Sequence, residues 1–195
     1  MAPLSTTRTH SKACKRLLSG MFFFPPLFDM FCLSNFPSHK LTGTIAFNAP
    51  RFQPSFASHL LLSFTERVLI GRCPLRLAFK DMLAQACDLG RHSDVFLLTT
   101  DKEGALTCSR FAWANLEVRP WGHHLPIQCS GCGWANSWRS AYVKGSKDKS
   151  YIFECKNDSC NVSHTFSQPP GSTVLYSGRK NGGTWLDIPL ETEFA

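Results

Sequence analysis

The sequence predicts an α+β fold, on the strength of three patterns. Residues 57–70 and the stretch after Pro74 are apolar in the manner of packed helices. Residues 95–100 and 105–111 have the composition of two strands joined by a turn. Residues 126–168 combine strand-like segments with closely spaced cysteines. We therefore expect a helix-plus-hairpin segment over 57–115, followed by a β-rich cysteine module with C-terminal strands over 120–190.

The first 56 residues are expected to form an irregular, basic region. They show no steady hydrophobic period and contain frequent prolines and scattered phenylalanines. Residues 1–80 carry ten Lys or Arg against two acids. The apolar stretch 21–33 is too short and too broken by proline to span a membrane. A mitochondrial presequence is the alternative interpretation, because basic and hydroxyl side chains abound and no acid precedes Asp29.

The helical part is expected to contain two helices. Residues 57–70 are apolar enough for a buried helix that Gly71 would end. After Pro74, one helical face is formed by residues at positions i, i+3, i+4, i+7 and i+8, namely Phe79, Met82, Leu83, Ala86 and Cys87. Gly90 is the expected C-terminal cap of this second helix.

The hairpin that follows contains acidic residues that could have chemical roles. Asp94, Asp101 and Glu103 flank a strand and could bind Mg²⁺, but turn and capping roles explain them more simply. His92, Ser93 and Asp94 are of the residue types found in catalytic triads. Three adjacent residues cannot form a proton relay, so we expect no catalysis from them.

Cysteine usage indicates a reducing compartment. The chain has nine cysteines, an odd number, whereas a secreted disulfide framework generally uses an even set behind a signal peptide. We expect an intracellular protein, cytoplasmic or nuclear. Five cysteines are isolated in the sequence and are expected to be ordinary buried or free thiols: Cys14, Cys32, Cys73, Cys87 and Cys108.

The other four cysteines form two close pairs with the spacing of a zinc site. Cys129 and Cys132 are separated by two residues, and Cys155 and Cys160 by four. Two thiolates on one tight turn can occupy two corners of a tetrahedral Zn²⁺ shell, and the second pair completes it. Gly131 suits the backbone geometry of such a turn. His164 could replace Cys160 as a ligand, and two disulfides or plain thiols are the other possibilities.

Strand patterns surround these pairs. Residues 134–143 and 151–155 are expected to pair across a turn at 145–150, with a third strand over 162–166. Together with the C-x-x-C-G knuckle, this arrangement resembles the zinc-ribbon class. The resemblance implies a closed, structural zinc site. The second knuckle departs from the usual C-x-x-C, which leaves open which atoms ligate the metal.

The module also offers a candidate contact surface for a protein or a nucleic acid. Its aromatic and basic residues are Trp134, Trp138, Arg139, Tyr142, Lys144 and Lys147. The simpler interpretation is that the aromatic rings form the core of the module. Residues 126–168 carry five basic and three acidic side chains, and zinc with four thiolates would offset that excess. Protein contact is thus at least as well supported as nucleic-acid contact. An enzyme or enzyme remnant, with the ribbon as a structural appendage, is the alternative function.

A wider resemblance covers the C-terminal part of the chain. The residues Trp121-Gly, Pro126-Ile-Gln-Cys, Trp138, Phe153-Glu-Cys, Cys160, Phe166 and Gly182-Gly-Thr-Trp resemble the endings of orphan proteins from mushroom-forming fungi. The resemblance implies a cysteine-rich ending behind an α/β domain of unsettled activity, and it carries no established reaction to any residue here.

Overall fold

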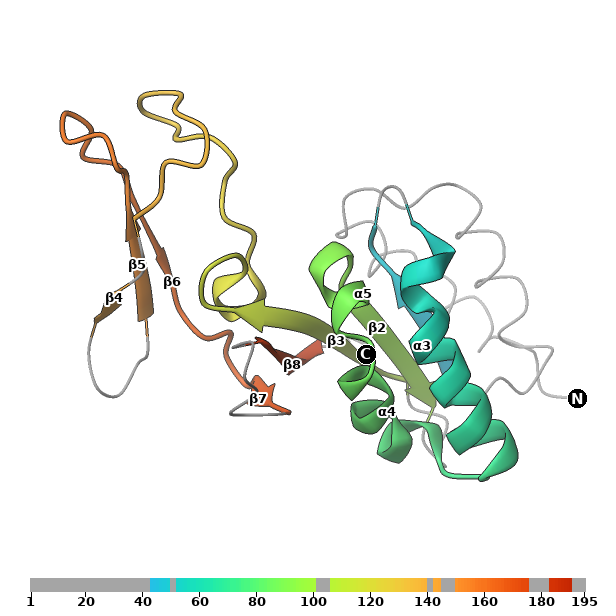
Figure 1. Cartoon of the computed structure of the whole chain (residues 1–195). Coiled ribbons are helices and arrows are strands. Elements are labelled where there is room, and N and C mark those ends of the chain that lie inside the picture. Colours follow the sequence, from blue (N-terminus) through green and yellow to red (C-terminus); the bar gives the residue numbers. More distant parts are fainter. Residues whose placement is uncertain are drawn as a thin grey trace, which may run out of the picture. The chain divides into compact units, whose positions relative to one another are not determined.

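The α+β prediction is confirmed by a computed structural model of the chain (Figure 1). The structure describes residues 43–49, 52–100, 106–139, 142–144 (backbone only), 150–175 and 183–190. The chain divides into two units, one of Met1–Arg110 with Pro189–Ala195 and the other of Phe111–Ile188. Within the described ranges, no helix is both long and apolar enough to cross a membrane.

The first unit contains a long helix that confirms the helix predicted over 57–70. Helix α3 (Pro54–Phe64) begins with Pro54, whose fixed φ suits a first helical turn. It continues as the π-helix η1 (Thr65–Ile70), and Gly71 is the C-cap, as predicted. Ala57, Leu60 and Ser63 are buried along α3. The helix therefore packs along one face and leaves the opposite face exposed.

The second predicted helix is two helices, so the cap assigned to Gly90 was wrong. Helix α4 (Leu75–Ala84) ends at Gln85, and α5 (Cys87–His92) begins after a break in the backbone. Ala86 stays buried at the break, which is why the hydrophobic period continues although the helix does not. Gly90 is buried inside α5, whose C-cap is Ser93.

A five-stranded sheet is present among the described residues, in the order β1-β2-β3-β8-β7. Its central hairpin confirms the predicted strands, although β3 is longer than expected. The five strands are β1 (Gly43–Phe47), β2 (Val95–Thr100), β3 (Leu106–Asn115), β7 (Thr173–Val174) and β8 (Gly183–Leu190). Both β3 and β8 contain a boundary between the two units. The division into segments 57–115 and 120–190 stays a prediction.

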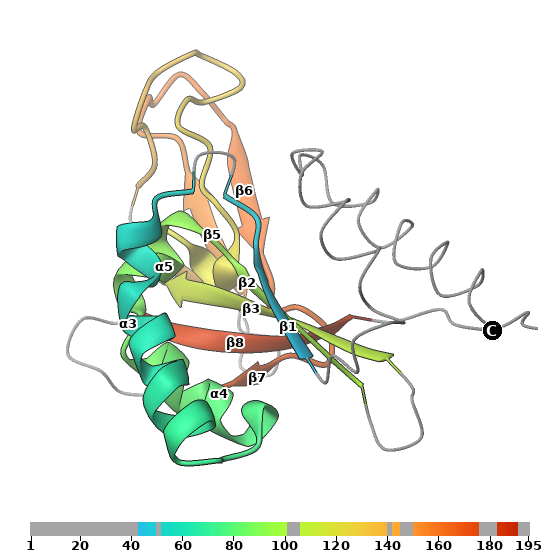
Figure 2. The same cartoon turned by 90° about the vertical axis from the view of Figure 1, so that its right-hand side faces the viewer.

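Strand β1 lies inside the region expected to be irregular. It pairs antiparallel with β2, with Gly43 opposite Thr99 and Phe47 opposite Val95. Only Ala46 of its five residues is buried, so the sequence shows no clear alternation. The strand forms because it pairs with a strand some 50 residues away in the sequence. Helices α3, α4 and α5 lie on one side of β1 and β2 (Figure 2).

Successive side chains of β2 point alternately to the two faces of the sheet and are buried on both. Val95 and Leu97 are fully buried, as are Leu60, Phe79, Met82 and Leu83 of the helices. Phe96 points the other way and packs with Ala46 and Cys108, bordered by Leu98 and Leu190. The core of this unit thus lies mainly between the sheet and its helices. Cys108 is a buried cysteine, as expected for an isolated cysteine, and Cys73 is an exposed free thiol.

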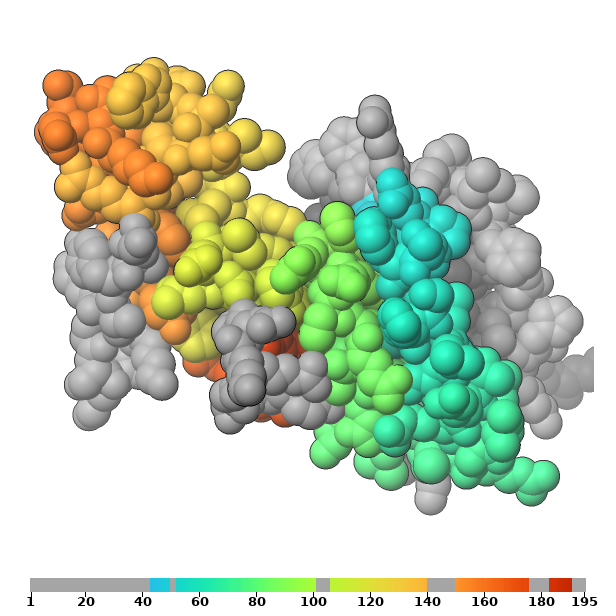
Figure 3. All heavy atoms as spheres, in the orientation of Figure 1, coloured from blue at the N-terminus to red at the C-terminus, as the bar shows by residue number. Residues whose placement is uncertain are grey.

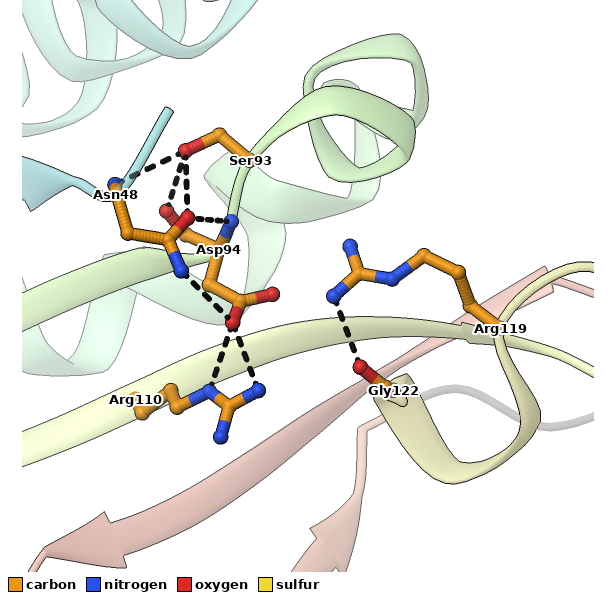
Figure 4. Close-up of polar contacts among 6 residues, drawn as sticks. All are labelled: Asn48, Ser93, Asp94, Arg110, Arg119 and Gly122. Carbon is orange, nitrogen blue, oxygen red and sulfur yellow. Dashed lines mark hydrogen bonds and ion pairs between the residues drawn. The ribbon is translucent and has the colours of Figure 1, made fainter. Parts of the chain in front are cut away.

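A polar network joins the end of β1, the start of β2 and the middle of β3 (Figure 4). The carboxylate of Asp94 is buried, and its Oδ2 accepts hydrogen bonds from Nε and Nη2 of Arg110, each at 2.8 Å. Asn48 Nδ2 donates to the same oxygen at 3.2 Å, while Asn48 Oδ1 accepts from the Asp94 amide at 2.8 Å. Ser93 Oγ accepts from the Asn48 amide. Asp94 therefore has a structural role that satisfies its charge inside the unit.

The second unit begins in β3 and turns at a buried arginine. Arg119 and Asn115 exchange two backbone hydrogen bonds, and Arg119 Nη2 donates to the Gly122 carbonyl at 2.9 Å (Figure 4). The short 3-10 helix η2 (Pro120–Gly122) follows. Trp121 packs in a core with Ala112, Ala114, Leu186 and Ile188, and its ring stacks on Tyr151 at 5.4 Å between centroids.

The cysteine module of the second unit contains a three-stranded antiparallel sheet in the order β4-β5-β6. The strands are β4 (Tyr142–Lys144), β5 (Ser150–Glu154) and β6 (Ser163–Phe166). The second and third predicted strands are confirmed. Among the described residues of the strand expected over 134–143, regular strand structure begins at Tyr142. The segment before it makes isolated bridges, from Gln128 to Ala135 and from Trp138 to Cys155. A continuous strand is interrupted there because Asn136 adopts a left-handed conformation (φ 50°).

Candidate metal centre

The first cysteine pair sits on a tight turn between two short paired segments. The Cys129 amide donates to the Trp134 carbonyl at 2.9 Å, and the Asn136 amide donates to the Ile127 carbonyl at 2.8 Å. The Gly133 amide closes the turn on the Cys129 carbonyl at 2.8 Å. Gly133 has φ +72°, a left-handed conformation that glycine adopts without a steric penalty. The turn thus directs both thiols of the pair to one side.

Gly131 is required at this turn for a different reason. A Cβ on this residue would lie 2.7 Å from Cγ2 of Val162 and 3.2 Å from Sγ of Cys160. Only a residue without a side chain allows the first turn to approach the second pair of cysteines this closely. The glycine therefore permits the two halves of the site to meet.

The second cysteine pair is held by β5 and by an asparagine turn. Cys155 directly follows β5, and its amide donates to the Val162 carbonyl at 3.0 Å. Asn157 organises the loop: its Oδ1 accepts from the Ser159 amide at 3.1 Å, and its carbonyl accepts from the Cys160 amide at 2.8 Å. This turn accommodates the four intervening residues and returns Cys160 to the site.

The four sulfur atoms converge. All four Sγ atoms lie within 4.8 Å of one another, and they belong to Cys129, Cys132, Cys155 and Cys160. The Cys129–Cys160 and Cys132–Cys155 separations are both 3.6 Å. A tetrahedral shell with metal–sulfur bonds of about 2.3 Å has edges of about 3.8 Å, whereas a disulfide bond is about 2.05 Å long. The four cysteines are therefore positioned to hold a metal ion rather than to form two disulfides.

Backbone amides and neighbouring thiols adjust the acidity of two of these cysteines. The Cys132 amide, with the Gly131 amide and the facing thiols, lowers the pKa of Cys129 to about 7 against the opposing effect of burial. The Val162 amide lowers the pKa of Cys160, but burial and the neighbouring thiols raise it, so that this pKa is about 11. One thiol of the cluster thus ionises readily, and a bound cation would stabilise the others as thiolates.

The four-cysteine cluster is partly shielded from solvent. Cys129 and Cys155 are buried, while Cys132 and Cys160 are half-buried. A polar hollow of about 420 Å³ borders the second pair and is lined by Arg139, Glu154 and Asp158 among others. Arg139 and Asp158 form an ion pair across the module. Arg139 is therefore engaged within the module as well as exposed at its surface.

His164, the alternative ligand, lies outside the four-sulfur cluster. It sits on β6 opposite Phe153, and its ring packs edge-on against Trp138 with centroids 4.7 Å apart. Its Nε2 is buried and has no hydrogen-bond partner among the described residues. The indole N–H of Trp138 donates to the Pro126 carbonyl at 2.7 Å. Trp138 and His164 are thus part of the packing beside the four-cysteine cluster.

The predicted contact residues differ in their exposure. Trp134 is 57% exposed, and Ile127 on the facing segment is 77% exposed. Trp138 is half-buried. Lys147 lies outside the described residues, as do the side chains of Tyr142 and Lys144. The described surface beside the first turn is therefore apolar rather than basic.

Sequence reasoning missed the partners of Asp94. Asn48 and Arg110 are 46 and 16 positions away from it, and no local pattern connects them. His92, the neighbour of this network, stacks on Phe56 with ring centroids 4.0 Å apart. In the part of the chain that the structure describes, the four-cysteine cluster is the one group of three or more metal-ligating side chains.

Comparison of this chain with protein-family models, with curated proteins and with solved structures gives no match.

Proposed function

We propose that residues 126–168 bind one zinc ion as a structural zinc ribbon and that the metal-held module supports a contact surface for a protein partner. The observation that carries the proposal is the convergence of four sulfur atoms within 4.8 Å. Four thiolates in a tetrahedron suit zinc, and they leave no coordination position open for a substrate. Iron is the other metal that such a sulfur shell accommodates.

The small size of the module explains why it would need a metal. Its sheet consists of three short strands, with Ile152 and Phe153 as the buried apolar residues of β5. A core of this size contributes little stability on its own. Zinc binding in small modules contributes roughly 10–16 kcal/mol. The metal would therefore supply most of the free energy that folds the module.

The contact surface that we propose is centred on Trp134 and Ile127. These exposed apolar residues lie on the paired segments that carry the first turn. A tryptophan at the surface is typical of the residues that anchor protein interfaces. Nucleic-acid binding has less support, because Trp138 packs against His164 and Arg139 is paired with Asp158. Arg139, Tyr142, Lys144 and Lys147 stay candidate contact residues in this proposal.

An elemental analysis tests the metal, and binding assays test the surface. The full-length protein purified under reducing conditions should contain one zinc per chain and no stoichiometric iron. Trp134→Ala should keep that zinc but lose the partner recovered with the wild type from cells. Binding to single-stranded nucleic acid that Trp134→Ala weakens would instead favour the nucleic-acid alternative. Protein that is folded yet free of metal would contradict the proposal.

The proposal places the protein in a reducing intracellular compartment, where thiols remain available to the metal. The resemblance to orphan fungal proteins brings no reaction that could be assigned to these residues. The enzyme alternative lacks a comparable observation among the described residues.

A further inference from the structure

Exposed aliphatic side chains concentrate on the helical hairpin formed by α3, η1 and α4. The described residues include eleven large exposed apolar side chains, and five of them lie on this hairpin: Leu61, Leu62, Leu69, Ile70 and Leu77. Ile70 and Leu77, on either side of the connecting turn, are 74% and 71% exposed. We call residues 69–77 the hairpin tip; it lies at the lower right of the molecule as drawn in Figures 1 and 3. Exposed apolar side chains that gather in one place are typical of binding surfaces.

Basic side chains surround these aliphatic residues. Arg72, Arg76 and Lys80 are all exposed, and Glu66 is the one acidic residue between positions 54 and 80. Arg76 and Lys80 are four positions apart on α4 and so lie on the same helical face. Asp81, the next acid, pairs with Arg67 of η1 at 3.2 Å. The rim of the tip is therefore positively charged.

Arg72 holds an unfavourable backbone conformation at the centre of the tip. Its φ is +53°, in the left-handed region that favours glycine or asparagine at the end of a helix. The neighbouring glycine, Gly71, has an ordinary φ of −74°. The turn is closed by hydrogen bonds from the Gly71 amide to the Glu66 carbonyl and from the Cys73 amide to the Arg67 carbonyl, both at 2.9 Å. Because glycine would adopt this conformation without strain, an arginine here indicates that its side chain has a function.

We propose that the hairpin tip docks on the surface of a membrane rich in anionic phospholipid. Leu69, Ile70 and Leu77 would enter the boundary between headgroups and acyl chains, and Arg72, Arg76 and Lys80 would contact the lipid phosphates. Exposed aliphatic residues with basic neighbours are typical of helices that lie at a membrane interface. The proposal is independent of the metal site.

Vesicle sedimentation with the full chain tests this inference. The protein should sediment with phosphatidylcholine vesicles that contain about one third phosphatidylserine, and more weakly as salt increases. Vesicles of phosphatidylcholine alone should bind it less. Equal sedimentation with both kinds of vesicle, or none with either, would overturn the proposal.

Three variants test whether the vesicles are bound by the tip or by another basic part of the chain. Ile70→Ser should weaken binding to the anionic vesicles about tenfold. The matched control is Val118→Ser, because Val118 is also an exposed aliphatic residue (54%) but lies in the turn after β3, outside the tip and outside the proposed contact surface; its binding to the vesicles should equal that of the wild type. Arg72→Gly should weaken binding about fivefold, although it should raise the melting temperature by relieving the left-handed arginine.

Wild-type vesicle binding by Ile70→Ser and Arg72→Gly would refute the proposal. So would a protein that does not bind vesicles but self-associates through the tip, with Ile70→Ser converting an oligomer to a monomer in sedimentation velocity. A raised melting temperature combined with weaker binding in Arg72→Gly would support it, because loss of folding cannot produce that combination.

Discussion

The Sγ atoms of Cys129 and Cys160 lie 3.6 Å apart although the two residues are 31 positions apart in the chain. Cys132 and Cys155 have the same separation. Each close approach thus joins one cysteine of the first turn to one of the second, and neither turn forms the cluster alone. A metal bound by all four would link the two turns and would be lost when either is disturbed.

Cys132→Ser should abolish stoichiometric zinc binding and unfold residues 126–168, because one missing thiolate removes a large part of the zinc free energy. The helices and hairpin of the first unit should keep their secondary structure. Elemental analysis and circular dichroism would measure the two effects. Cys73→Ser is the matched control, since Cys73 is an exposed free thiol outside the cluster. Equal zinc loss in the control, or full zinc retention in Cys132→Ser, would contradict the assignment of ligands.

Gly131→Ala should weaken zinc binding at least tenfold in a chelator competition. The added methyl group would lie 2.7 Å from Val162 Cγ2 and 3.2 Å from Cys160 Sγ, so the two turns would have to separate. Gly133→Asn is the comparison, because space is open around Gly133 and asparagine tolerates its left-handed conformation. Zinc affinity in that variant should stay close to that of the wild type. If both substitutions have the same effect, the close packing at Gly131 is not what matters.

Trp138→Ala should destabilise the cysteine module by about 2–4 kcal/mol, because the half-buried ring packs against His164 and its indole N–H binds the Pro126 carbonyl. Trp134→Ala should change stability by less than about 0.5 kcal/mol, because its ring is mostly exposed. Denaturant unfolding followed by release of zinc would measure both values. Unaltered stability and zinc content in Trp138→Ala would restore the idea that this ring is an exposed platform.

Asp94→Asn should destabilise the first unit by about 2–3 kcal/mol. It removes the charge that the Arg110 guanidinium neutralises in a buried network, and Arg110 itself is a third exposed, which limits the cost. Asp81→Asn is the matched control: it breaks an ion pair of which both members are well exposed, so it should cost less than about 1 kcal/mol. Thermal unfolding of both variants measures the difference. Equal effects would show that burial of Asp94 adds nothing to its ion pair.

The features that local sequence determined are those whose physical cause lies within a few residues. Strand β2 was predicted with its observed bounds, because a run of apolar and β-branched residues favours an extended backbone regardless of its partners. The end of the long helix at Gly71 was likewise predicted from one glycine. The two cysteine pairs were identified because two thiols on one turn must lie close together. The predicted strand over 134–143 was wrong at its start, because Asn136 adopts a left-handed conformation that interrupts it and Ala135 pairs with Gln128 instead.

Tertiary structure alone decided which segments meet. Strand β1 has one buried residue and exists through its pairing with β2, and β8 joins the sheet beside β3 from far along the chain. The partners of Asp94 and the crossed approach of Cys129 to Cys160 are set by the same long-range pairing. Contacts of this kind depend on closing loops of tens of residues, whose free energy is the sum of many small terms spread over the chain. A short stretch of sequence does not reveal this total free energy. Local sequence therefore predicted the turns that carry the cysteines, whereas only the folded chain determined how those turns face each other.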